Sequence, residues 1–239
     1  LDVDPKSQVK DKDLFASEMG FKEALSGVYS LMTKEGLYGK ELTFGWLGVL
    51  GQEWTSVPYN YEDDQKYDFE NAASEVRIDS VWTGLYNAIA NANKLLKELE
   101  GMSTVIPGSR RIPLVFFILF SGDNYSIIKG EVLALRAYLH FDLLRIFGAS
   151  CAVGMERIAI PYVTEYAPTI FPQEKVGDFV GKVLKDLQDA AKCLENDPIL
   201  TGRTVSEIDD NGYLMNRQVH LNYYAVKGLM ARVYLYKGD

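Results

Sequence analysis

Few residues in this chain carry the side chains that usually bind transition metals. Its 239 residues include two cysteines and two histidines. Cys151 and Cys193 form no CxxC motif and are not near a histidine cluster, which argues against a zinc site. We therefore expect neither a metal site nor a cofactor. The two cysteines are compatible with a disulfide or with two free thiols.

The sequence also lacks a long hydrophobic run. The longest, Ile112–Phe120, covers nine residues, too few for a helix that crosses a bilayer. This run is compatible with a buried strand-like segment or with the start of a helix. The first residues, Leu1–Lys6, are polar and acidic, unlike the apolar core of a secretory leader.

Positive charge is scarce. The chain has 25 Lys and Arg against 33 Asp and Glu, for a net charge of -8, which argues against a nucleic-acid partner. Hydrophobic residues make up 47% of the chain, enough for a sizeable core and too many for general disorder. The 15 tyrosines suit half-exposed binding surfaces or packing between helices, because the ring can be buried while the hydroxyl stays polar.

Hydrophobic periodicity predicts an all-α protein. Loops are expected between the helices, including a long exposed one over 51–75 and another over 148–173. The two main helix pairs are expected near 78–147 and 174–236. The expected helices cover 14–32, 41–50, 78–99, 125–147, 174–194 and 218–236.

Two helical stretches, Gly130–Gly148 and Tyr224–Asp239, resemble each other. Each follows an amphipathic helix and ends in a glycine turn. A helix pair used twice is typical of a stacked α-helical repeat, which usually presents a surface rather than catalysing a reaction. The matching positions are Ala134 with Ala225, Arg136 with Lys227 and Ala137 with Gly228.

The 51–75 loop contains the best candidates for ligand binding, namely Trp54, Tyr59, Asn60 and Tyr61. Flat aromatic rings stack on the C–H faces of sugars, and amides hydrogen-bond to the hydroxyls. The alternative is that Trp54 and Tyr61 anchor the loop to the core.

Other polar residues have simpler explanations. Glu62–Asp64 could supply the two carboxylates of a glycosidase, but adjacent loop carboxylates more often form a solvated turn. His140 and His220 have no triad partner in view and are expected to be structural. Arg136 and Arg145 are expected to form ion pairs within the helix stack.

Short segments along nearly the whole chain occur in the order found in one known family. They are Leu1–Lys6, Val81–Trp82 with Leu85–Asn93, Gly130–Glu131 with Arg136–Arg145, Ile160–Tyr162, and Ala231–Leu235. Together they resemble the SusD/RagB family of outer-membrane nutrient-binding lipoproteins.

The resemblance implies an α-α superhelix of tetratricopeptide-like helix pairs. It also implies a surface-exposed lipoprotein of the outer membrane that binds oligosaccharides without cleaving them. Such a protein would pass its ligand to a SusC-like TonB-dependent transporter. The precursor is expected to carry a lipidated cysteine just before Leu1. The rival interpretations are an intracellular tetratricopeptide scaffold and a glycoside hydrolase.

The sequence departs from the family in two places. Family members continue well beyond the helix that ends near Asp239, so 1–239 is expected to be the N-terminal helical part of a longer family chain. An apolar face near Leu229, Val233 and Tyr236 is then expected to be exposed or covered by another chain, because stacked repeats need a capping neighbour. The Ile112–Phe120 run also replaces a connection that is usually polar.

Overall fold

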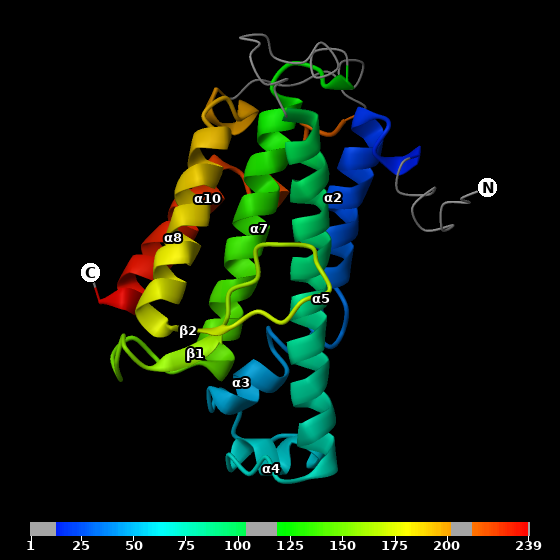
Figure 1. Cartoon of the computed structure of the whole chain (residues 1–239). Coiled ribbons are helices and arrows are strands. Elements are labelled where there is room, and N and C mark those ends of the chain that lie inside the picture. The colour runs from blue at the N-terminus through cyan, green and yellow to red at the C-terminus, as the bar shows by residue number, and fades with distance from the viewer. Residues whose placement is uncertain (1–12, 104–118, 202–211, 239) are drawn as a thin grey trace, which may run out of the picture. The chain divides into compact units, whose positions relative to one another are not determined.

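The computed structural model of the chain describes residues 13–103, 119–201 and 212–238. It is mostly helical, which confirms the predicted fold class, and it adds one small hairpin (Figure 1). In the described part of the chain, no helix combines the length and the apolar character needed to cross a membrane. The helices are α2 (Glu18–Met32), α3 (Trp46–Leu50), α4 (Glu62–Gln65), α5 (Ala72–Ser103), α7 (Asn124–Phe147), α8 (Val176–Cys193) and α10 (Tyr223–Lys237).

The chain divides into two compact units. The large unit comprises Leu1–Leu25 and Ala90–Asp239, and the small unit comprises Ser26–Ile89. Short 3₁₀ helices occur in both: η1 (Tyr59–Tyr61) in the small unit, and η2 (Pro198–Leu200) and η3 (Arg217–Val219) in the large one.

Helix α7 is the centre of the large unit. It is buried at most of its positions because α8 and α10 both pack against it. Gly130 allows α7 to approach the end of α8 closely, since a Cβ at this position would lie 2.7 Å from Leu194 Cγ. Helix α8 contributes a regular apolar stripe, as its sequence predicts, made of Val176, Phe179, Val180, Val183 and Leu187.

The 148–173 segment contains a strand that the sequence analysis placed in a loop. Strand β1 (Ile158–Pro161) pairs antiparallel with β2 (Gln173–Lys175), with an irregularity between the two ends of the register. The pairing is short because Pro161 has no N–H to donate. Strands this brief leave no clear alternation of polar and apolar residues, so periodicity did not reveal them.

The prediction that an apolar face of α10 is exposed or covered by another chain is wrong. Leu229 and Val233 are 4% and 0% exposed, and the half-buried Tyr236 packs its ring edge-on against Phe141 at 5.3 Å. This face of α10 already contacts α7 and α8. The exposed apolar residues of α10 lie elsewhere on the helix, where Leu235 is 79% exposed.

Two helices begin at asparagine caps that shift their predicted starts. Helix α5 begins at Ala72 rather than Ile78, because Asn71 Oδ1 accepts hydrogen bonds from the backbone N–H groups of Ala73 and Ser74 at 3.1 and 2.9 Å. Helix α10 begins at Tyr223 rather than 218, because Asn222 caps it in the same way. Such caps supply acceptors for N–H groups that have no partner within the helix.

Some predictions fall partly outside the described residues. Leu1–Lys6 lies outside them, as does most of Ile112–Phe120. Phe120 itself is buried, and its ring lies 5.0 Å from that of Phe21.

Cys151 and Cys193 are free thiols, which resolves the choice that the sequence left open.

Candidate functional site

Exposed aromatic side chains gather in one stretch of the small unit. Tyr59 is 88% exposed and Trp54 is 46% exposed. Single exposed apolar side chains are common on protein surfaces, so it is the grouping of several rings within residues 44–69 that is informative. The full set is Phe44, Trp54, Tyr59, Tyr67 and Phe69.

The four predicted site residues divide into two groups. Trp54, Tyr59 and Asn60 are exposed, whereas Tyr61 is only 5% exposed. The Tyr61 hydroxyl donates to Glu41 Oε1 at 2.7 Å. Burial, followed by this hydrogen bond, raises the pKa of Tyr61. Tyr61 therefore holds the loop to the core, and its ring is not available to a ligand.

Three hydrogen bonds fix the path of the loop that carries Trp54. Gln52 Nε2 donates to the carbonyl oxygen of Gln65 at 2.8 Å, and Gln65 Nε2 donates to that of Trp54 at 2.9 Å. The Tyr67 hydroxyl donates to the carbonyl oxygen of Leu50 at 2.9 Å. Each bond joins residues 50–54 to residues 65–67, so the two ends of the segment 50–67 are held together.

Gly48 of α3 supports the Trp54 indole. A Cβ at position 48 would lie 2.7 Å from Trp54 Nε1, closer than two such atoms normally approach. The ring is therefore partly packed on the helix backbone and partly exposed. Sequence reasoning missed this role, because a glycine in a helix gives no sign of what lies against it.

We expect Gly48→Ala to displace the Trp54 ring and leave the fold intact, because the clash involves the end of a movable side chain. The stability change should stay within about 1 kcal/mol, since alanine favours the helix over glycine by about that amount. Tryptophan fluorescence and thermal melting measure the two effects. Gly27→Ala is the control, because a Cβ there has no neighbour within 4 Å. An unchanged emission spectrum in Gly48→Ala would contradict the packing.

A buried polar cluster lies under this loop. Asp64 is fully buried, accepts a hydrogen bond from Trp46 Nε1 at 3.1 Å and pairs with Arg77. The Arg77 guanidinium lies over the Tyr61 ring at 4.1 Å and donates to the Asn60 carbonyl oxygen at 2.9 Å. The main chain at Asn60 is thus fixed while its side chain stays exposed.

This cluster explains the Glu62–Asp64 run. Asp64 is held by Arg77 and Trp46, so it is not one of two free carboxylates facing a shared cleft. Glu62 and Asp63 are exposed. The run begins the short helix α4 and supports the loop, so it is not the solvated turn expected from the sequence, because Asp64 is buried and paired.

His140 and Arg136 belong to a second buried cluster, in the large unit. Arg136 donates to both Asp186 oxygens at 2.7 and 2.8 Å, which confirms the expected ion pair. His140 Nδ1 lies 2.9 Å from the Arg136 carbonyl oxygen, and the Val163 N–H donates to His140 Nε2 at 3.0 Å. These two bonds together require the neutral ring with its proton on Nδ1. Arg145 likewise pairs with Asp142.

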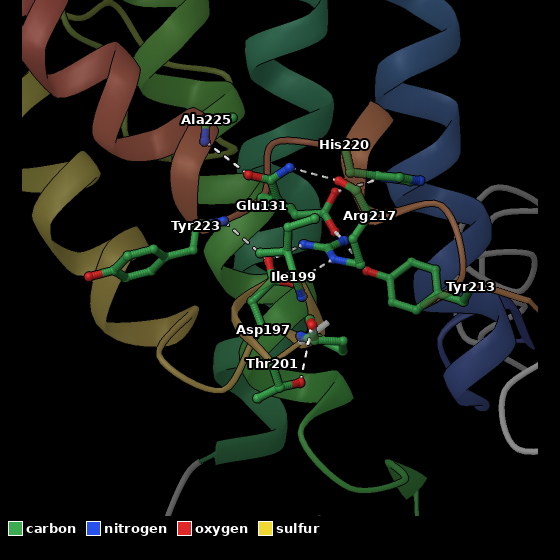
Figure 2. Close-up of polar contacts among 11 residues, drawn as sticks. Glu131, Asp197, Ile199, Thr201, Tyr213, Arg217, His220, Tyr223 and Ala225 are labelled. Carbon is green, nitrogen blue, oxygen red and sulfur yellow. Dashed lines mark hydrogen bonds and ion pairs between the residues drawn. The ribbon is translucent and has the colours of Figure 1, made fainter. Parts of the chain in front are cut away.

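A third buried cluster centres on Arg217 (Figure 2). Its guanidinium lies between the carboxylates of Asp197 and Glu131, both fully buried. It donates to the two Asp197 oxygens at 3.0 and 2.7 Å. His220 Nδ1 lies 3.0 Å from the other Glu131 oxygen. The cluster joins α7 to the segments that precede α10, and this accounts for His220 as a structural residue.

Comparison with known proteins identifies the family. A SusD-like family described as "Starch-binding associating with outer membrane" matches residues 1–235. The chain belongs to this family. No curated protein matches the sequence of this SusD-like chain.

Solved structures share its fold. A SusD homolog from Bacteroides thetaiotaomicron superposes with a TM-score of 0.68 at 20% identity, covering 95% of this chain and 37% of its own. A SusD-like carbohydrate binding protein from Bacteroides vulgatus gives 0.66 at 16% identity, covering 92% and 42%. A SusD superfamily protein from Bacteroides fragilis gives 0.66 at 18%, covering 92% and 46%. The chain thus spans less than half the length of these proteins.

Proposed function

We propose that this SusD-like chain captures oligosaccharides at the exposed aromatic loop of its small unit. The observation that carries the proposal is the pairing of exposed Trp54 and Tyr59 rings with a loop fixed by hydrogen bonds. The Trp54 and Tyr59 rings stack on sugar faces, the Asn60 amide contacts hydroxyl groups, and Tyr61 positions the loop from below. A pre-organised loop loses little entropy on binding.

The wider role that we propose follows from the family. Its description links starch binding with the outer membrane, which supports a surface lipoprotein that delivers its ligand to a SusC-like TonB-dependent transporter. A lipid anchor upstream of Leu1 would hold it at the membrane. Residues 1–239 would then form the N-terminal helical part of a longer chain, with helix pairs near 78–147 and 174–236. Co-purification of the full-length protein with a SusC-like transporter, and mass spectrometry of its native N-terminus, test these two points.

We expect Trp54→Ala to weaken oligosaccharide binding by about 1–3 kcal/mol, the cost of losing an aromatic binding residue. Stability should change little, because the ring is 46% exposed on a surface loop. Isothermal titration with starch-derived oligosaccharides and a panel of other glycans, together with thermal melting, measures both quantities.

Tyr224→Ala is the matched control, because Tyr224 is an exposed aromatic (58%) outside the small unit. It should leave affinity unchanged. If Trp54→Ala binds a glycan as tightly as the parent chain, Trp54 is not part of the binding site. If it lowers stability by the roughly 3–5 kcal/mol of a buried ring, Trp54 is a core anchor. Either result would contradict the proposed site.

A further inference from the structure

A groove lies in the large unit. One part has a volume of about 580 Å³ and the other about 300 Å³, and both are lined by Glu100, Arg136 and Thr164. Because they share these residues, the two parts form one groove, which we call the Arg136 groove. Its combined size falls in the range of small-ligand sites.

The larger part of the Arg136 groove is cationic, although the chain as a whole is acidic. Helix α8 supplies a row of residues at helical spacing, Lys182, Lys185, Asp189 and Lys192, which share one face of the helix. Helix α7 adds Lys129. Five cationic side chains therefore line this part, against the three carboxylates Glu100, Asp186 and Asp189.

Among the described residues, the ion pairs leave a smaller cationic excess than the lining suggests, because Lys182 pairs with Glu174. Asp186 is held by Arg136, and Asp189 is shared by Lys185 at 2.6 Å and Lys192 at 3.6 Å. Lys129 is half-buried and has no ion-pair partner among the residues that the structure describes. An unpaired cation in a hollow with low-dielectric walls attracts anions more strongly than one on an open surface.

The smaller part of the groove contains the Tyr166 ring, with Lys94 Nζ 5.7 Å from the ring centroid. Tyr166 is 48% exposed and lines this part together with Lys97 and Glu165. Next to it, Thr164 exposes a side chain with a hydroxyl group. The groove as a whole thus presents cations at one end and an aromatic ring with a hydroxyl at the other.

We propose that the Arg136 groove binds an anionic glycan, with its acidic groups against Lys129 and Lys192 and a sugar ring on Tyr166. The acidic groups are uronic-acid carboxylates or sulfates, which present the same charge to ammonium groups. This inference rests on the proposed function, because the glycan class follows from the family while the negative charge follows from the groove.

The test compares charged and neutral ligands on the same chain. Lys129→Gln combined with Lys192→Gln should weaken binding of oligogalacturonate or a sulfated oligosaccharide about tenfold at low ionic strength, since exposed and partly exposed pairs each contribute modestly. Binding of these ligands should weaken as salt is raised. Lys34→Gln combined with Lys227→Gln is the matched control, because both lysines are exposed and lie outside the groove. Tyr166→Ala should weaken binding in a way that salt does not change.

The outcomes separate the two proposals. If neutral oligosaccharides bind and depend on Trp54 while no acidic oligosaccharide binds, the groove proposal fails and the proposed function stands. If both lysine pairs reduce acidic binding equally, the attraction is general and the groove is not the site. If polyphosphate or an acidic peptide binds with the same lysine dependence, the glycan assignment is overturned. If no glycan of either kind binds, both proposals fail. Preference between oligogalacturonate and the sulfated ligand identifies the acidic group.

Discussion

We expect Arg217→Met to lose about 3–5 kcal/mol of unfolding free energy, the usual result of removing one partner from a buried ion pair. Arg217 is 2% exposed, and its two carboxylate partners, Asp197 and Glu131, are fully buried. Burial alone would lower the pKa of Arg217, but the bonds and charges of these two residues raise it instead. Without the guanidinium, both carboxylates would lose this counter-charge in a low-dielectric interior.

Urea unfolding followed by circular dichroism measures this loss. Arg157→Met is the matched control, because Arg157 is exposed and should change stability by less than about 0.5 kcal/mol. Adding Glu131→Gln and Asp197→Asn to Arg217→Met should recover part of the loss, since the variant then has no unpaired buried charge. A loss no larger than that of Arg157→Met would show that the cluster in Figure 2 contributes little.

We expect acid to destabilise the chain through His140. Burial lowers the pKa of His140 to about 3, and the positive charges of Arg136 and Lys182 add to this effect. The unfolded chain, with its histidine pKa near 6.5, takes up a proton first as the pH falls. The full unfolding free energy of the chain, as far as His140 affects it, is therefore present above pH 6.5. Below that pH, protonation of His140 in the unfolded chain lowers the unfolding free energy by up to about 1.4 kcal/mol per pH unit, down to about pH 3.

The structural reason is the acceptor role of His140 Nε2. Protonation would place a second N–H at Nε2 in place of the lone pair, and this group could no longer accept the hydrogen bond from the Val163 N–H. His140→Gln removes the titrating group, so its stability should depend less on pH between about 6.5 and 3.5 than that of the parent chain. Denaturant unfolding at several pH values gives the two curves. Parallel curves would rule out His140 as the source of the acid sensitivity, whatever the absolute stability of the variant.

Local signals predicted the helices well and their partners poorly. The apolar stripe from Val176 to Leu187 repeats at helical spacing, so α8 could be placed within a few residues. The starts of α5 and α10 were missed, because Asn71 and Asn222 are common loop residues whose capping role depends on the helix that follows. A strand as short as β1 leaves too little pattern to recognise.

The candidate site was also only partly predictable, because local composition reveals a loop but not its distant partners. A loop rich in aromatic and amide residues drew attention to Trp54, Tyr59 and Asn60, but composition could not separate these from Tyr61. That separation depends on Glu41, which lies 20 residues away in sequence and accepts the Tyr61 hydroxyl hydrogen bond. The Arg217 cluster joins residues up to 89 positions apart, and no local pattern connects them.

The hydrogen bonds that fix the aromatic loop are accepted by main-chain oxygens, so its exposed side chains can vary. The acceptors are the carbonyl groups of Leu50, Trp54 and Gln65, which every amino acid possesses. Residues 54, 59 and 60 can therefore be exchanged without removing an acceptor that shapes the loop. A lineage could replace, one at a time, the side chains that we propose to contact the ligand and acquire a new preference, while Gln52, Gln65 and Tyr67 keep the loop on the same path.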